Sequence, residues 1–362
     1  MKQRNPAMDV VRSFALLCVI SVHFFLNSGF YNETVSGFPM FFMVLLRNFF
    51  MICVPLFMIL SGYLLNTKKI SRSYFLKIFQ TLGIYLLASL FCAAYRFFFD
   101  RENFSFIGSF WGLFNFSTAT YSWYIEMYIG LFLLIPFLNL IYNNLTSQKH
   151  KKLLLLVLLI LTALPSVLNI WQFLNIQWWI RPSISSNHDY LAPDWWIGIY
   201  PVTFYFIGCY LKEYTLKIKR STNLLFILSV ALLTGIFNYY RSYGSVFQNG
   251  KWNEYCSLLV TVQATLVFNY LSTKDYSSLG SKTRKVLSKV SAWTLGAYLS
   301  SWVFDTAFYG ILCRWEPVMV KRILYFPLIV FCVFVCSVLA SALLNFVYNG
   351  AEKIISTVRK KN

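Results

Sequence analysis

The sequence has 362 residues, of which 58% are hydrophobic and only 12% are charged, and its formal net charge is +19. A soluble domain carries roughly 25% charged residues, so this chain could not cover itself with a polar surface. Apolar runs of about 20 residues, long enough to cross the hydrocarbon core of a bilayer as a helix, recur along almost the whole chain. The composition therefore indicates an all-α integral membrane protein and excludes an ordinary soluble enzyme.

Ten of these runs are predicted to be transmembrane helices. They lie near residues 8–30, 41–65, 75–98, 122–143, 152–170, 196–212, 222–240, 255–272, 291–312 and 323–348. The first resembles the apolar part of a signal peptide, but no small-residue cleavage site follows it. We expect it to be retained as the first transmembrane helix.

The basic residues are distributed unevenly between the two sides of these helices. Most of the 32 Lys and Arg residues fall in segments that share a side with the termini. Because basic loops stay in the cytoplasm, both termini are expected to be cytoplasmic. The loops expected outside lie near 31–40, 99–121, 171–195, 241–254 and 313–322. We expect one membrane-embedded domain over residues 1–350 and a short basic cytoplasmic tail over residues 351–362.

The same distribution argues against two other roles for the polar residues. A net charge of +19 would favour nucleic acid in a soluble protein, but here the basic residues follow the topology, so no nucleic-acid partner is expected. The eight cysteines mostly lie in apolar runs without paired metal-ligand spacing, so no metal site is expected. The lipid bilayer is the expected surrounding of the chain.

Two ionisable residues share one face of the first predicted helix. Arg12 and His23 are 11 residues apart in the sequence. In a helix this spacing corresponds to about three full turns plus 20° and a rise of about 16 Å. An Arg at the cytoplasmic edge could hold a phosphate, and a neutral imidazole inside the bilayer could take a proton from an attacking hydroxyl. The alternative is a topology charge and a histidine bonded to a neighbouring helix.

Three further charged residues lie within predicted helices. Glu126 is in the fourth, where a carboxylate needs a partner, so it could orient His23, pair with an Arg or form a purely structural pair. Asp305 in the ninth leaves the same alternatives open. Arg47, near the outer end of the second, could pair with either carboxylate or be a snorkelling side chain.

Two segments outside the helices could bind ligands. Arg72 and Lys77 precede the third predicted helix, and beside Arg12 they would form a phosphate-binding mouth, although ordinary positive-inside charge explains them as well. The external segment near 171–196 contains Trp178 and Trp179 among polar residues. Such flat apolar faces suit stacking on sugars, but interfacial tryptophans also form ordinary belts.

Several motifs together resemble those of a known bacterial family. They are Asp9, Arg12 and His23 on the first helix, the run 54–63 that ends in Ser61, Gly62 and Tyr63, the basic run 72–77, Trp123 with Tyr124, Gly130 and Pro136, the run 205–208 and the run 295–299. In this order they resemble the bacterial membrane acyltransferases called acyltransferase family 3. The similarity covers most of the chain, and the first two motifs are specific.

This resemblance implies ten core helices, acyl-CoA as the donor substrate and transfer of acyl groups, commonly acetyl, to sugars of surface polysaccharides. Carried over by position, Arg12 would bind the phosphate end of CoA and His23 would act in catalysis. The chain departs from the family pattern at Tyr121 and Ser301, where many members have histidines.

We therefore expect a membrane-bound O-acyltransferase of the bacterial cytoplasmic membrane. It would move an acyl group, most simply acetyl, from cytoplasmic acyl-CoA to a sugar hydroxyl of a surface glycan or its lipid-linked precursor, without a tightly bound cofactor. The residues predicted to act are His23 and Glu126 in catalysis, Arg12, Arg72 and Lys77 in acyl-CoA binding, and Arg47, Asp305, Trp178 and Trp179 on the acceptor side.

Two other functions remain open at this point. A proton-coupled transporter or exporter of glycan components would also use ten helices with buried His, Glu and Asp, although the motif on the first helix favours the enzyme. A polysaccharide polymerase would be expected to show a large external loop with several Arg, which this chain lacks.

Overall fold

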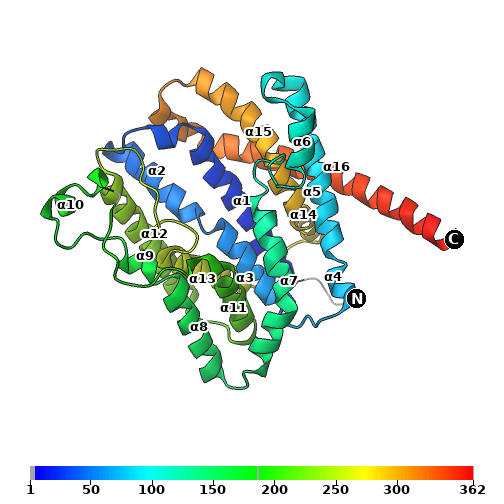
Figure 1. The fold of residues 1–362 in the computed structure, drawn as a ribbon, viewed down its shortest axis with the longest axis horizontal. Helices are drawn as coiled ribbons and strands as arrows, with labels where there is room; N and C mark the ends of the chain where they lie inside the picture. Colours follow the sequence, from blue (N-terminus) through cyan, green and yellow to red (C-terminus); the bar gives the residue numbers. More distant parts are fainter. Residues whose placement is uncertain (1–4, 186, 362) are drawn as a thin grey trace.

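The computed structural model describes residues 5–185 and 187–361, which fold almost entirely into helices (Figure 1). The longer helices are α1 (Pro6–Asn27), α2 (Gly37–Phe50), α3 (Cys53–Leu65), α5 (Ile78–Phe99), α7 (Trp123–Asn144), α8 (Gln148–Thr162), α11 (Tyr200–Glu213), α12 (Arg220–Ser242), α13 (Leu258–Ser272), α14 (Ser281–Ala292), α15 (Thr294–Trp315) and α16 (Phe326–Lys361). The connections contain α4 (Arg72–Phe75), α6 (Phe106–Gly112), α9 (Pro165–Leu168), α10 (Ile176–Ile180) and the 3-10 turns η1 (Phe30–Asn32), η2 (Arg101–Asn103), η3 (Pro182–Ile184), η4 (Ile197–Ile199) and η5 (Met319–Tyr325). No strand occurs among the described residues, which confirms the all-helical class.

Six helical segments of the described chain are long and apolar enough to cross a membrane. They are Pro6–Asn27, Gly37–Leu65, Arg72–Phe99, Trp123–Asn144, Arg220–Ser242 and Met319–Ile354. The other four predicted segments contain α8, α11, α13 and α15, which lie outside this set. Each predicted segment thus contains helix, and the six long apolar segments indicate a multi-pass membrane protein.

Prolines interrupt two segments that the sequence predicts as single helices. Between α2 and α3 the chain turns at Met51 and Ile52. Pro55 explains this break, because it cannot donate a hydrogen bond to the Met51 carbonyl and its ring would clash with that group in a continuous helix. In the segment near 152–170, α8 ends at Thr162 and Pro165 begins α9, a position where proline is favoured.

Contacts near the ends of the helices and between the loops define two ends of the helix bundle. At one end, which we call the Arg12 end, Arg12 bonds Ser291, Lys151 bonds Glu213 and Asn269 bonds the Leu216 carbonyl. The opposite end, the loop end, joins the segments near 28–36, 116–121, 171–199, 243–257 and 316–322. There the Val35 amide donates to the Ser245 carbonyl, and Arg322 Nη1 donates to the Ser28 carbonyl.

The centre of the bundle depends on close approach between α3 and α11. A Cβ atom on Gly62 would lie 1.9 Å from the Tyr205 carbonyl oxygen, and one on Gly208 would lie 2.0 Å from the Ile59 carbonyl oxygen. Two glycines therefore let the backbones touch, as small residues do in membrane helix pairs. The run 54–63 and the run 205–208, far apart in the sequence, are two halves of this one contact.

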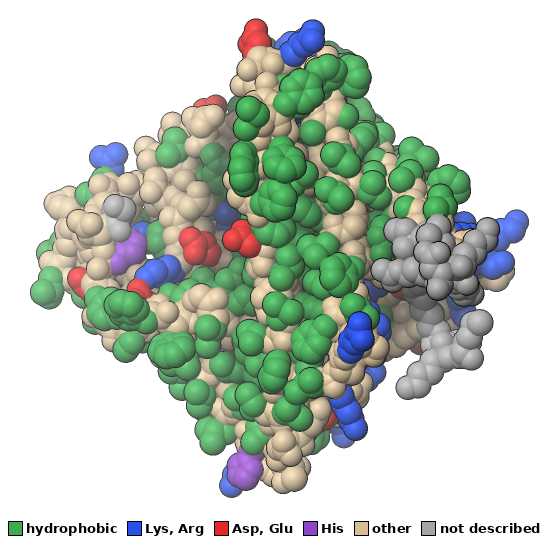
Figure 2. Space-filling model, turned by 45° about the vertical axis from the view of Figure 1, so that its right-hand side comes forward, with side chains coloured by type: hydrophobic (Ala, Val, Ile, Leu, Met, Phe, Trp, Pro, Cys, Tyr) green, Lys and Arg blue, Asp and Glu red, His purple; other side chains and the backbone are tan. Residues whose placement is uncertain are grey.

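Much of the outer surface is apolar. Large exposed hydrophobic side chains occur along α5, α7, α8, α12 and α16. Figure 2 shows one face over which hydrophobic side chains are spread from top to bottom. A soluble protein rarely exposes so large an apolar patch, so this surface suits contact with lipid. The C-terminal part of α16 runs out beyond the bundle (Figure 1), so the segment predicted as a tail continues that helix through Lys361.

Candidate active site

A histidine, an aspartate and a tyrosine from three helical regions meet inside the bundle. His23 of α1 and Asp305 of α15 are both buried, and His23 Nδ1 lies 3.1 Å from Asp305 Oδ2. The Tyr121 hydroxyl, just before α7, donates to the same Asp305 oxygen at 2.9 Å. The rings of His23 and Tyr121 also pack together, with centroids 3.9 Å apart. We call these three residues the His23 cluster.

The cluster prepares His23 to accept a proton. A carboxylate can only accept, so Nδ1 carries the hydrogen in this contact and Nε2 keeps its lone pair. When Nε2 takes a proton, the neighbouring carboxylate stabilises the resulting imidazolium. Asp305 Oδ1 has no hydrogen-bond partner among the described residues, so this carboxylate retains capacity to accept. Such a histidine, oriented by an acid, is suited to general-base chemistry.

Asn27, one turn after His23 in α1, holds the cluster in place. Its Nδ2 donates to the His23 carbonyl at 2.8 Å and to the Tyr121 hydroxyl at 3.2 Å. Because the Tyr121 hydroxyl is thereby a donor to Asp305 and an acceptor from Asn27, its orientation is fixed. Tyr121, one of the two departures from the motif pattern, contributes a hydroxyl to the cluster. Ser301, the other departure, is buried and donates to the Tyr298 carbonyl at 2.8 Å.

The carboxylate that lies beside His23 is not the one that the sequence suggested. Glu126 was predicted to orient His23, but it is exposed in the first turn of α7. The carboxylate beside His23 belongs to Asp305, which was assigned to the acceptor side. Asp305 lies 282 positions from His23 in the sequence. Periodicity within one helix cannot reveal which distant helix packs against it.

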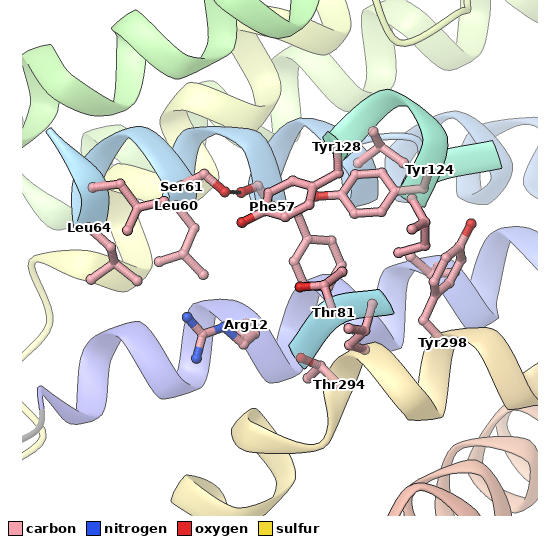
Figure 3. Close-up of a pocket in the computed structure, with 15 residues that line it drawn as sticks. Arg12, Phe57, Leu60, Ser61, Leu64, Thr81, Tyr124, Tyr128, Thr294 and Tyr298 are labelled. Atoms are coloured by element: carbon pink, nitrogen blue, oxygen red, sulfur yellow. Dashed lines mark hydrogen bonds between the residues drawn. The ribbon is translucent and has the colours of Figure 1, made fainter. Parts of the chain in front are cut away.

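Arg12 lies at one end of a cavity of about 260 Å³ between the helices, which we call the Arg12 cavity. Figure 3 shows Arg12 on α1 facing Leu60, Ser61 and Leu64 on α3, with Tyr298 at the far side. The Arg12 side chain is partly exposed, and its Nη1 donates to Ser291 Oγ at 3.1 Å. The guanidinium of Arg12 thus lies at one end of the Arg12 cavity, a mostly apolar slot with a few hydroxyl groups along its wall.

Two tyrosines connect the Arg12 cavity with His23. Tyr298 lines the cavity, and its hydroxyl donates to the Tyr121 carbonyl. Tyr121 in turn packs on the His23 ring. Along α1, Arg12 and His23 are separated by about 16 Å of helix, with Val19 of the cavity wall between them. An extended ligand held by Arg12 would therefore point along the slot toward the His23 cluster.

A second, wider hollow of about 990 Å³ lies beside Arg12 at the same end of the bundle. We call it the basic hollow, because its wall carries four cationic side chains, Lys274, Arg284, Lys285 and Lys289. Asp9, one turn before Arg12, also lines it. Basic residues near 274–289 were read from the sequence only as topology charge, and their clustering around a hollow depends on the amphipathic helix α14.

The two other basic residues predicted to bind acyl-CoA lie outside both hollows. Arg72 and Lys77 are exposed, at the start of α4 and just before α5. Lys77 is one turn before Thr81, which lines the Arg12 cavity. Lys77 is therefore one helical turn from the wall of the Arg12 cavity. Arg72 is the first residue of α4, which packs through Tyr74 onto Phe132.

Arg47, a candidate for the acceptor side, is buried, and each of its three guanidinium nitrogens donates a hydrogen bond within the protein. It donates to the Tyr31 hydroxyl at 3.0 Å and to the Asn253 carbonyl and Asn249 Oδ1, both at 3.1 Å. Its guanidinium also lies over the Phe247 ring. Arg47 thus fastens the segment 247–253 to α2, and no carboxylate takes part in these contacts.

The remaining motif residues divide between packing and lining. Ser61 lines the Arg12 cavity while its Oγ donates to the Phe57 carbonyl at 2.9 Å. Tyr63 packs on Phe268 and under Lys212.

The predicted tryptophans gather at the loop end. Trp123 stacks on Tyr255, and the partly exposed Trp179 stacks on Trp171. Trp178 is buried against the guanidinium of Arg241.

Comparison with known proteins bears on this geometry. A search of curated proteins and a search of solved structures returned no match. A family model described as an acyltransferase domain matches residues 5–342, nearly the whole chain, including the His23 cluster and Arg12. The chain therefore belongs to acyltransferase family 3 and is an acyltransferase.

Proposed function

We propose that the protein moves an acyl group, most simply acetyl, from cytoplasmic acyl-CoA to a sugar hydroxyl of a cell-surface polysaccharide or its lipid-linked precursor. The observation that carries this proposal is the His23–Asp305 pair lying beyond a narrow slot whose other end holds Arg12. The donor has an anionic end, an extended arm and a reactive thioester. The basic hollow would hold the first, the Arg12 cavity the second, and the His23 cluster would lie at the third.

Each part of the site has a defined task in this reaction. The basic hollow and Arg12 hold the phosphates of CoA, since cationic side chains form strong charge-assisted bonds with phosphate. The acyl-carrying arm occupies the apolar slot. His23 Nε2 removes the proton of the sugar hydroxyl as its oxygen attacks the thioester carbonyl. The carbon–sulfur bond then breaks, the thiolate leaves with a proton from His23, and the acyl ester remains on the sugar.

The proposal includes an orientation in the bacterial cytoplasmic membrane. Ten spans, with α8, α11, α13 and α15 added to the six long apolar segments, would place both termini and the Arg12 end in the cytoplasm. The concentration of Lys and Arg on that side supports this orientation. Cysteine-labelling probes at positions 70, 150, 216, 280 and 360 should report cytoplasm, and those at 35, 110, 185 and 247 the exterior. Exterior labelling at 150 and 216 would contradict it.

The activity is tested in vesicles that contain the purified protein. Labelled acetyl-CoA is supplied on the Arg12 side and extracted surface glycan on the other, and mass spectrometry follows the glycan. We expect the glycan to gain the mass of one acetyl group per transfer. Label that crosses the membrane without becoming covalently joined to sugar would instead identify a transporter.

A further inference from the structure

Arg241 is a buried arginine at the loop end that plays no part in the reaction described above. It is near the end of α12, and its side chain is 1% exposed. The guanidinium is sandwiched between two indole rings, with its Cζ 4.6 Å from the centroid of Trp178 and 4.3 Å from that of Trp252. Stacking of this kind holds the side chain flat and desolvates its faces.

The edge of the same guanidinium is mostly unused. Arg241 Nη2 lies 3.4 Å from His188 Nε2, while Nε and Nη1 have no hydrogen-bond partner among the described residues. His188 Nδ1 donates to the Asn187 carbonyl, so Nε2 is the acceptor in the contact with Arg241. A buried cation that is satisfied only by a neutral imidazole and two rings is energetically costly, and buried charges are normally paired.

Arg241 lines a cavity of about 310 Å³, which we call the Arg241 cavity. Its wall also includes His188, Tyr190, Lys251 and Trp252. The two acidic residues of the wall are already engaged: Asp194 pairs with Lys251, and Asp189 accepts a hydrogen bond from the Phe173 amide at 2.7 Å. Neither carboxylate forms an ion pair with Arg241, so its positive charge has no carboxylate partner among the described residues of this wall.

The Arg241 cavity lies on the same side of the bundle as the acceptor approach. The segment 243–256, which forms part of its wall, also pairs with the chain after α1 through the Thr34–Val246 bridge. At the other end of this segment, the ring of Tyr255 stacks on that of Trp123, with centroids 5.6 Å apart. Trp123 is two residues after Tyr121 of the His23 cluster. One loop therefore connects the wall of this cavity with the surroundings of His23.

We propose that the Arg241 cavity binds an anionic sugar group, a carboxylate or a phosphate carried on the acceptor glycan. The guanidinium of Arg241 supplies the positive charge that meets the negative group, Lys251 lines the same wall in its pair with Asp194, and the rings of Trp252 and Tyr190 offer flat faces to the sugar. This inference rests on the proposed function for its acceptor, but the site predicts binding whether or not an acyl donor is present.

Direct binding to purified protein in nanodiscs, without donor, tests the inference. The probes are an oligomer of a uronic acid, a hexose phosphate and the matching neutral oligosaccharide. We expect wild type to bind at least one charged probe about tenfold or more tightly than the neutral one, because charge-assisted hydrogen bonds are strong. The preference of one charged probe over the other distinguishes carboxylate from phosphate.

Variants connect this preference to Arg241. Arg241→Gln should abolish it, whereas Arg314→Gln, an exposed arginine of α15 bonded to its own helix, should leave it intact. If Arg241→Gln does not fold, as judged by its melting curve, Lys251→Gln serves instead and should weaken the preference. Equal binding of charged and neutral sugars by wild type, or a preference that survives Arg241→Gln, would overturn the inference. Neither result depends on acetyl transfer, so failure of the proposed function would be seen separately in the vesicle assay.

Discussion

His23 lies in α1 and His188 in the loop between η3 and η4, and the charges beside the two imidazoles have opposite signs. His23 Nδ1 faces the carboxylate of Asp305, whereas His188 Nε2 faces the guanidinium of Arg241. The first neighbour stabilises an imidazolium and the second opposes one. Burial lowers the pKa of His188, and the charges of Arg241 and Lys251 act in the same direction. The sign of the nearest charge is therefore what separates the proposed base His23 from the neutral acceptor His188.

The same contrast extends to the charged partners. Asp305 Oδ2 accepts from two donors inside the protein, His23 Nδ1 and the Tyr121 hydroxyl, which suits a group that holds a base in one orientation. Arg241 keeps unused donors, which suits a group that waits for a ligand. Asp305 therefore contacts groups of the protein itself, whereas on our proposal Arg241 gains an anionic partner only when a ligand binds.

The largest effect is expected when the carboxylate beside His23 is neutralised. Asp305→Asn should lower acyl transfer by about 10² or more, the scale of general-base catalysis, because the imidazole loses the negative charge that stabilises its protonated form. Affinity for acetyl-CoA should stay unchanged, since Asp305 does not line the Arg12 cavity. Transfer rate and equilibrium donor binding, measured on the same preparation, separate the two effects.

Glu126→Gln is the matched control for that substitution. Because Glu126 is exposed, its neutralisation should change transfer by no more than about twofold. A large loss of transfer in Glu126→Gln together with near-normal transfer in Asp305→Asn would restore Glu126 as the partner of His23 and remove Asp305 from that role.

A smaller effect is expected at the other end of the Arg12 cavity. Arg12→Ala should weaken acetyl-CoA binding about tenfold or more, whereas Arg12→Lys should recover part of it, because phosphate recognition needs the charge and benefits from the planar fork. Isothermal titration or scintillation proximity with purified protein measures this. Arg72→Ala, at an exposed position outside both hollows, should have a modest effect at most. Unchanged affinity in Arg12→Ala would reduce Arg12 to a topology charge.

The smallest effect is expected at His188 and concerns stability. Because its pKa is lowered in the folded protein, the unfolded chain binds a proton first as the pH falls below about 6.5. The folded state therefore loses stability as the pH falls through that region. His188→Gln should flatten this acid-side decline in the thermal midpoint, while His150→Gln, exposed on α8, should not. An identical slope in His188→Gln and wild type would show that His188 does not contribute.

Local pattern carried much of the fold and part of the site. Apolar runs of the right length located the helical segments, and the spacing of Arg12 and His23 placed both on α1, where the structure has them. Prolines at 55 and 165 could have predicted the breaks in two segments, because their effect is local. The predicted ends of the helices differ from the observed ends by a few residues, because caps and turns are weak signals in a sequence.

What the sequence could not reveal depends on which helices pack together. Asp305 was noticed as a costly carboxylate, but only the contact between α1 and α15 makes it the partner of His23. Arg241 was missed as a site residue, although an arginine closing an apolar run is a visible signal. Its meaning comes from Trp178 and Trp252, which reach it from two separate loops.

The central role of His23 is tested most directly by measuring donor binding and transfer together in one variant. His23→Gln protein, reconstituted in vesicles and loaded with labelled acetyl-CoA, is mixed with glycan and followed over single turnovers beside wild type. We expect the variant to melt normally, to hold the labelled donor with wild-type affinity and to pass it to the glycan at least about 10² times more slowly. Near-normal transfer by His23→Gln would contradict general-base catalysis by His23 and leave it a structural residue.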